Sequence, residues 1–149
     1  MLRFTQAAPT NFFEERALHS RTLACMYSLE VETEFSAAHA IVLHGVREVV
    51  HGHNWHVQCE VEGPVLDPEG LLCDFHALES ALAKVTAPFR NADLNMVPPF
   101  DAVNPTAEHV AKHIAEELIA RLPNGVRLAC VRVTEAPRCV AVYRPTSHR

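Results

Sequence analysis

Three histidines, His39, His51 and His53, have the residue type and spacing for a metal site. His51 and His53 are two positions apart in an alternating segment, so both side chains leave the same face of a strand, next to Trp55. Imidazole nitrogens that converge at an apolar surface suit a zinc ion, and catalytic zinc commonly keeps three protein ligands and one open position. His39 is placed to be the third ligand, because the strand before it is expected to pair with the strand that carries the other two. The spacing alone leaves a second interpretation open, a polar strand start that binds no metal.

Other histidines have weaker cases as ligands. His109 and His113 are four residues apart on an expected helix. Such a pair could bind a metal ion, but it is more typical of the solvent-exposed face of a helix. His56 points to the polar face of its strand. The remaining weak candidates are His44 and His76.

Alternating and helical patterns predict how the three histidines are held. Strict alternation of apolar and polar residues predicts half-buried antiparallel strands, and apolar residues at spacings of three and four predict amphipathic helices. Asp74 and Thr106 stand near the expected helix starts, where they suit the free N–H groups. The predicted elements are strands over 28–35, 51–62, 126–135 and 139–143 and helices over 71–85 and 106–122, with loops over 39–50 and 91–105.

The order β-β-α-α-β-β predicts an α+β fold with a four-stranded antiparallel sheet and both helices on one face. The other face of the sheet would need cover, which copies of the same chain could supply. We expect a single domain over residues 27–149 and a non-catalytic N-terminal extension over residues 1–26.

Composition excludes several classes of function. A formal net charge of -5 argues against a nucleic-acid partner, which would need a basic face. No apolar run approaches the roughly 20 residues that cross a bilayer, so no membrane partner is expected. The chain has five cysteines and no C-x-x-C motif, which indicates reduced thiols and a cytoplasmic location.

Five motifs occur in a fixed order along residues 27 to 144. They are Phe35-Ser36-Ala37-Ala38-His39, His51-Gly52-His53-Asn54-Trp55, Leu72-Cys73-Asp74-Phe75, Asn104-Pro105-Thr106-Ala107-Glu108 and Val131-Arg132-Val133-Thr134-Glu135. Together they resemble the 6-pyruvoyl-tetrahydropterin synthase and 6-carboxytetrahydropterin synthase family. The resemblance implies a tunnelling fold that assembles into a barrel-like oligomer, usually a hexamer of two trimers. It also implies Zn2+ as the cofactor and 7,8-dihydroneopterin triphosphate as the substrate.

The resemblance also assigns roles in substrate binding. Glu135 corresponds to the residue that anchors the pterin ring, whose N3–H and 2-amino groups one carboxylate can accept side by side. Thr106 and Glu108 correspond to residues at a helix start near the ring. For Glu108 a second role is equally open, the stabilisation of the first helical turn through the helix dipole.

The chain departs from the family at the catalytic residues. No cysteine stands in residues 45–50, where the named synthases carry one, but Glu48 precedes His51 by three residues. This resembles a subgroup that has Glu-x-x-His-Gly-His and releases 6-hydroxymethyl-7,8-dihydropterin, a folate precursor. A carboxylate beside the metal can act as the base of a retro-aldol cleavage, so Glu48 is the predicted catalytic residue.

A second departure affects the other proton-transfer group. Arg90 and Asn91 stand where the family has an Asp-His pair, and neither is a usual proton shuttle. Asp93 could substitute for the pair, and Arg90 could instead bind an anion such as the triphosphate.

Three hypotheses therefore remain. The first is a zinc-dependent pterin lyase with Glu48 as base, for which the 6-carboxy and 6-pyruvoyl products are less favoured because the cysteine is absent. Such an enzyme would serve folate or queuosine biosynthesis. The second is a diverged paralogue that binds zinc and a pterin-like ring without lyase chemistry. The third is a zinc hydrolase that reuses the three-histidine site.

Overall fold

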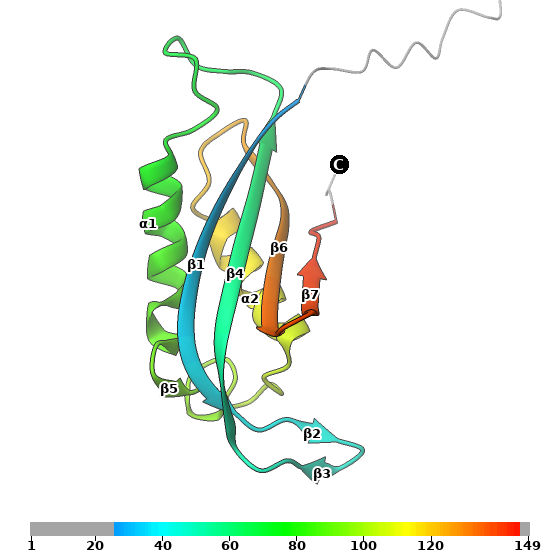
Figure 1. Ribbon diagram of the computed structural model, residues 1–149. Coiled ribbons are helices and arrows are strands. Elements are labelled where there is room, and N and C mark those ends of the chain that lie inside the picture. The colour runs from blue at the N-terminus through cyan, green and yellow to red at the C-terminus, as the bar shows by residue number, and fades with distance from the viewer. Residues whose placement is uncertain (1–25, 147–149) are drawn as a thin grey trace, which may run out of the picture.

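The computed structural model describes residues 26–146 and shows an α+β fold with one main sheet and two covering helices (Figure 1). The predicted extension over residues 1–26 lies outside the described residues, except for Met26. The sheet contains the strands β1 (Tyr27–His39), β4 (His51–Gly63), β5 (Ala92–Asp93), β6 (Arg127–Ala136) and β7 (Cys139–Tyr143).

The strand order is β5-β1-β4-β6-β7, so the prediction of a four-stranded antiparallel sheet is wrong in one respect. The short strand β5 lies in the segment predicted to be a loop, and it pairs in parallel with β1 through Ala37 and Ala92. The other neighbouring strands pair antiparallel, as predicted. Two residues of pairing give too weak a period-2 signal for the sequence pattern to identify such a strand.

Both helices cover one face of the sheet. Helix α1 (Phe75–Thr86) packs against β1, and α2 (Ala107–Ile119) packs against β6 and β7. Asp74 and Thr106 are their N-caps, because each side chain accepts a hydrogen bond from a backbone N–H in the first turn. The buried residues of the two helices recur at the predicted spacings of three and four, but Phe75 is exposed. The helices are also shorter than predicted, because α1 begins at residue 75 and not 71, and α2 ends at residue 119 and not 122.

The hydrophobic core lies between the helices and the sheet. Trp55 and Val57 of β4 are fully buried there, and Phe35 of β1 stacks on Trp55. His113 also contacts this core, with its ring against Phe89 and Phe100. The prediction that the His109 and His113 pair marks the solvent face of the helix is therefore correct only for His109, which is exposed.

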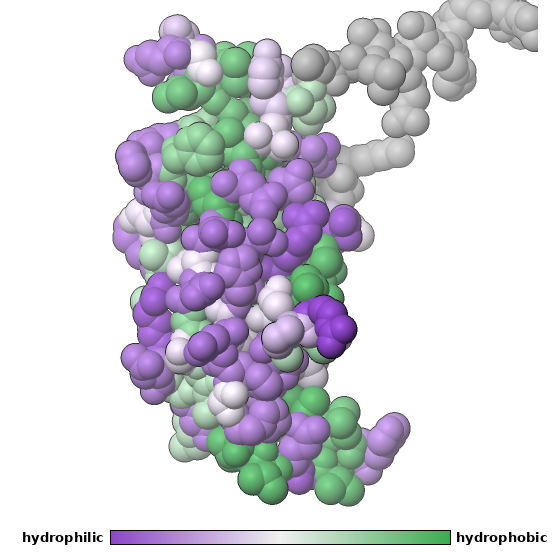
Figure 2. Space-filling model, in the orientation of Figure 1, coloured by the Kyte–Doolittle hydropathy of each residue, from purple (hydrophilic) through white to green (hydrophobic). Residues whose placement is uncertain are grey.

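The opposite face of the sheet carries polar side chains. Figure 2 shows this face as a largely hydrophilic surface over β1, β4 and β6. Ion pairs cross the strands there, between His56 and Glu32 at 3.2 Å and between Arg132 and Glu60 at 3.5 Å. The barrel-like oligomer expected to cover this face stays a prediction.

An arm, residues 40–50, leaves the sheet between β1 and β4 (Figure 1). It contains a two-stranded hairpin of β2 (Val42–Leu43) and β3 (Val46–Arg47), within a segment predicted to be a loop. His44 and Gly45 at the tip both have positive φ, which is the conformation of the two-residue turn that matches the twist of a hairpin. Residues 26–146 also contain two 3-10 turns, Ala87–Phe89 and Leu94–Met96.

No helix among residues 26–146 has the length and hydropathy needed to cross a bilayer.

Candidate metal centre and adjacent cavity

The pairing of β1 with β4 brings the three histidines together. His39 lies directly opposite His51, and Ala37 lies opposite His53, so the three rings leave the same face at the ends of two adjacent strands. The ring centroids are 4.8 to 5.2 Å apart. The rings of His39 and His53 stand edge-on to Trp55, which anchors the cluster on the core.

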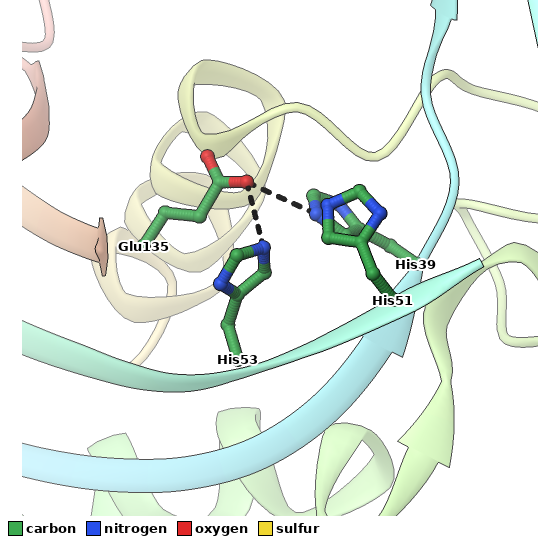
Figure 3. Close-up of side chains that lie close together, drawn as sticks. All are labelled: His39, His51, His53 and Glu135. Atoms are coloured by element: carbon green, nitrogen blue, oxygen red, sulfur yellow. Dashed lines mark ion pairs between the residues drawn. The ribbon is translucent and has the colours of Figure 1, made fainter. Parts of the chain in front are cut away.

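Glu135 joins the cluster from β6. Figure 3 shows its carboxylate directed at the histidines, with Oε1 3.0 Å from His39 Nε2 and 3.3 Å from His53 Nε2. Thr134 pairs with Val140 and Ala136 pairs with Cys139, so Glu135 is the bulged residue in the β6–β7 ladder. A bulge re-aims the side chain that it carries, which explains how a strand residue reaches a site on β1 and β4.

Two of the rings are held in a form that leaves a nitrogen lone pair free. His39 Nδ1 lies 2.8 Å from the carbonyl oxygen of Pro105, and His51 Nδ1 lies 2.9 Å from that of Val49. A carbonyl oxygen only accepts hydrogen bonds, so Nδ1 carries the proton and Nε2 is the acceptor in the neutral ring. Such carbonyl partners are typical of histidines that bind a metal through the other nitrogen.

The buried nitrogens of the cluster fit a cation. His39 Nε2 and His53 Nε2 are buried and make no hydrogen bond, although Glu135 Oε1 is within ion-pair distance of both. A lone pair that faces a carboxylate oxygen is unfavourable unless a proton or a metal ion lies between them. Burial lowers the pKa of His53 against an opposing effect of Glu135, and the neighbouring rings of His39 and His51 lower it further. The three histidines and Glu135 could therefore hold a metal ion.

A cavity of about 430 Å³ adjoins Glu135 between the arm, the start of α2 and the β6–β7 turn. It brings together all three residues predicted to bind the substrate, Glu135, Thr106 and Glu108. Glu108 is exposed in the first turn of α2, which is compatible with both of its predicted roles. The other lining residues are Ile41, Leu43, Ala107, Cys139, Val140 and Ala141.

Cys139 also lines this cavity, although no sequence motif marks it. Cys139 lies on the same side of β7 as Ala141, next to the strand end that carries Glu135. It is exposed, whereas Cys59 and Cys130 are buried. The four cysteines in the described part of the chain are all free thiols.

Glu48 lies outside the histidine cluster in the single chain. Its side chain is exposed on the arm, and its backbone N–H donates to the carbonyl of Ile41 at 3.0 Å. It remains close to the cluster along the chain, because β4 and His51 begin three residues later. Its role as the base stays a prediction.

Asp93 is not among the side chains that converge with the histidines, although Asn91 and Asp93 line a cavity of about 590 Å³ together with His53. Arg90 donates to Thr33 Oγ1 at 3.1 Å and lines a separate cavity of about 280 Å³ together with Asn91. Asp93 caps the 3-10 turn that follows it, by accepting the N–H of Asn95. Asp93 as a substitute for the family's Asp-His pair therefore stays a prediction.

Comparison with known proteins decides the family. A sequence model described as 6-pyruvoyl tetrahydropterin synthase matches residues 28–146. The chain belongs to this family.

Curated relatives and solved structures agree with this assignment. An Archaeoglobus fulgidus protein with the provisional name 6-carboxy-5,6,7,8-tetrahydropterin synthase is 35% identical over 105 residues, which cover 70% of this chain and 84% of that protein. The 6-carboxy-5,6,7,8-tetrahydropterin synthase of Bacillus subtilis is 33% identical over 128 residues, which cover 80% and 86%. The structure of Caenorhabditis elegans 6-pyruvoyl tetrahydropterin synthase superposes with a TM-score of 0.72 at 22% identity, covering 82% of this chain and 97% of that one, which establishes the shared fold.

Proposed function

We propose that this chain is a zinc-dependent lyase that cleaves the side chain of 7,8-dihydroneopterin triphosphate and releases 6-hydroxymethyl-7,8-dihydropterin. The observation that carries the proposal is the pair of buried, unpartnered Nε2 atoms of His39 and His53, which Glu135 connects to a cavity. The family and the names of the relatives support a pterin as the substrate.

The cavity has the size and the groups that a pterin needs. Its volume of about 430 Å³ falls within the roughly 300–1,000 Å³ of typical small-molecule sites. The carboxylate of Glu135 can accept both the N3–H and the 2-amino group of the ring, and apolar side chains such as Ile41 and Ala141 can contact its faces. The Thr106 hydroxyl and the Glu108 carboxylate offer further polar contacts at the start of α2.

His39, His51 and His53 would hold the zinc ion, which would supply a Lewis acid that makes a side-chain hydroxyl of the substrate easier to deprotonate. Glu48 removes the proton of the C2′ hydroxyl, and the C1′–C2′ bond breaks with its electron pair moving to C1′. A proton then adds to C1′ from the newly formed Glu48 carboxylic acid, which completes the hydroxymethyl group. The C2′ and C3′ carbons leave as a phosphorylated aldehyde.

A relative supports a glutamate in this role. A Plasmodium vivax 6-pyruvoyltetrahydropterin synthase with the same fold, at a TM-score of 0.66 and 20% identity, has been solved with a catalytic glutamate replaced by alanine. The arm of the present chain carries one carboxylate, Glu48, and no cysteine.

The test is product analysis of the zinc-loaded protein with 7,8-dihydroneopterin triphosphate. We expect 6-hydroxymethyl-7,8-dihydropterin by mass spectrometry, and its loss on metal removal and in Glu48→Gln. Glu69→Gln is the matched control, because Glu69 is an exposed carboxylate in the loop after β4. Normal turnover in Glu48→Gln would exclude this mechanism.

A second candidate is the formation of 6-carboxytetrahydropterin, which the names of the two curated relatives favour. The same assay distinguishes it by the mass of the product. A third outcome, pterin binding without conversion, would indicate a diverged paralogue. The presence of Arg90 and Asn91 in place of the family's Asp-His pair favours that outcome. A diverged paralogue of this kind requires that Glu135→Ala abolish pterin binding.

A further inference from the structure

Two asparagines hold the chain where it leaves β1. Asn95 accepts the N–H of Ala40 at 2.7 Å through Oδ1 and donates to the carbonyl of Ala40 at 2.9 Å through Nδ2. Asn104 does the same to Val42, at 2.9 and 3.1 Å. A side-chain amide presents an acceptor and a donor side by side, so each asparagine makes the pair of bonds that a residue of a neighbouring antiparallel strand would make.

These bonds fall in a gap between two regular ladders. The pairing of β1 with β4 ends at His39 and His51, and the pairing of β2 with β3 begins at Val42 and Arg47. Ala40 lies in this gap and is fully buried. Its backbone groups need partners there, and Asn95 supplies both of them.

The clamped segment is connected directly to the metal centre. The carbonyl of Pro105, next to Asn104, accepts the Nδ1 proton of His39 at 2.8 Å. The carbonyl of Asn104 itself lies 2.7 Å from Nδ1 of His109, which ties the loop to α2. The loop that binds the backbone of Val42 through Asn104 therefore also orients the His39 ring, through the carbonyl of Pro105.

The same segment is connected to the arm. Ile41 stands between the two clamped residues, and its carbonyl accepts the N–H of Glu48 at 3.0 Å. The carbonyl of Val49, the next residue, accepts the Nδ1 proton of His51 at 2.9 Å. Movement of residues 40–42 would thus displace the Glu48 backbone and the partner of a second histidine.

We propose that Asn95 and Asn104 are positioning residues that clamp residues 40–42, and so fix the His39 ring for metal binding and the Glu48-bearing arm for catalysis. The metal half of this proposal rests on the geometry of the histidine cluster. The Glu48 half rests on the proposed function.

The test compares the zinc affinity of Asn95→Ala, Asn104→Ala and Asn104→Asp, measured by competition with a chelating dye. Loss of a group that orients a metal ligand typically weakens affinity about 10- to 100-fold, and we expect a loss of this size in both alanine variants. Asn104→Asp keeps the acceptor for the Val42 N–H but turns a second oxygen toward the Val42 carbonyl, so it should lose zinc affinity as well. Asn124→Ala, at an exposed turn before β6, is the control and should bind zinc normally.

A spectroscopic measurement separates positioning from general destabilisation. We expect the visible spectrum of the cobalt-substituted protein to change in the alanine variants while the far-UV circular dichroism stays as in the original chain. If an alanine variant does not fold, Asn104→Asp decides the metal half. Unchanged zinc affinity and an unchanged cobalt spectrum in folded variants would overturn the proposal.

Turnover tests the Glu48 half separately. If the original chain converts 7,8-dihydroneopterin triphosphate, the zinc-saturated Asn95→Ala protein should show a lower kcat with little change in KM, and an unchanged kcat would overturn this half. If the original chain has no turnover, the proposed function fails, while zinc affinity and the cobalt spectrum still decide whether the clamp positions His39.

Discussion

At the scale of single residues, Glu135 has two possible partners that exclude each other. Its Oε1 atom lies within 3.3 Å of two histidine nitrogens, and its side chain also lines the adjoining cavity. Zinc with four protein ligands is closed, whereas zinc with three keeps a position for substrate. If Glu135 anchors the ring during turnover, its carboxylate must leave the histidines when the pterin binds.

Substitutions at the cluster should separate these two roles. We expect His39→Ala to weaken zinc binding by more than the roughly 10- to 100-fold that loss of a ligand's partner causes, because it removes a buried ligand. Glu135→Gln should retain zinc and lose affinity for dihydroneopterin, since a neutral amide replaces the carboxylate. Zinc content and calorimetric titration measure both effects, with the exposed His76→Ala as control. Loss of zinc in Glu135→Gln equal to that in His39→Ala would identify Glu135 as an obligatory ligand.

The cysteines should differ in reactivity because only the thiolate is nucleophilic. Burial raises the pKa of the Cys59 thiol to about 12, and it also raises the pKa values of Cys73 and Cys130. Cys139 is exposed at the cavity. We expect iodoacetamide at pH 7.5 to modify Cys139 before these three, and dihydroneopterin to protect it. Peptide mapping by mass spectrometry measures both, and equal labelling with and without the pterin would contradict its binding in this cavity.

At the scale of elements, three consecutive residues before α2 make three different structural contacts. Asn104 bonds to the backbone of Val42, the carbonyl of Pro105 orients His39, and Thr106 caps the helix through the N–H of His109. Each contact uses a different group, namely a side-chain amide, a carbonyl and a hydroxyl. The start of α2 is thereby fixed to the metal centre on one side and to the cavity on the other.

Helix α2 also carries a pH-sensitive contact with the core. Burial of His113 against Phe89 and Phe100 lowers its pKa from 6.5, so the unfolded chain binds this proton more readily than the folded chain. Stability should therefore fall as pH decreases below about 6.5. We expect His113→Leu to lose less stability than the original chain between pH 7.5 and 5.5, measured by urea unfolding of the metal-free proteins. An equal loss in both proteins would show that His113 does not contribute.

At the scale of the whole molecule, the arm exposes apolar side chains that a single chain leaves uncovered. The exposed fractions are 69% for Val46 and 87% for Val49, and Figure 2 shows apolar surface at this end of the molecule. Contiguous apolar surface of this kind usually marks an interaction site. It supports the expectation of a homo-oligomer, for which the predicted hexamer of two trimers is the specific form.

The oligomer can be tested by sedimentation. We expect the native mass to be at least twice that of the 16.6 kDa chain, and the Val46→Asp, Val49→Asp double variant to dissociate because charges would enter the interface. Val65→Asp is the control, because Val65 is equally exposed, at 73%, in the loop after β4. A monomeric original chain would contradict the prediction.

Local patterns were sufficient to predict much of this molecule. Alternation of apolar and polar residues predicted strands in the four regions where β1, β4, β6 and β7 form. Asp74 and Thr106 were expected near the helix starts and are the N-caps, although α1 begins at Phe75 and not at residue 71. The convergence of the three histidines also followed from local rules, because a spacing of two residues fixes the face and the pairing of adjacent strands fixes the distance. The family resemblance was carried by motifs of this kind and was confirmed.

The tertiary structure alone decided the rest. The bonds from Asn95 to Ala40, Asn104 to Val42 and Pro105 to His39 join residues that are 55, 62 and 66 positions apart. The pairing of β5 with β1, the contact of His113 with the core and the place of Cys139 in the cavity also depend on the path of the chain. Periodicity and capping are short-range effects of backbone geometry, so they determine which elements form. Which distant residues meet is set by the packing of those elements, and a single sequence without its fold carries no local signal for it.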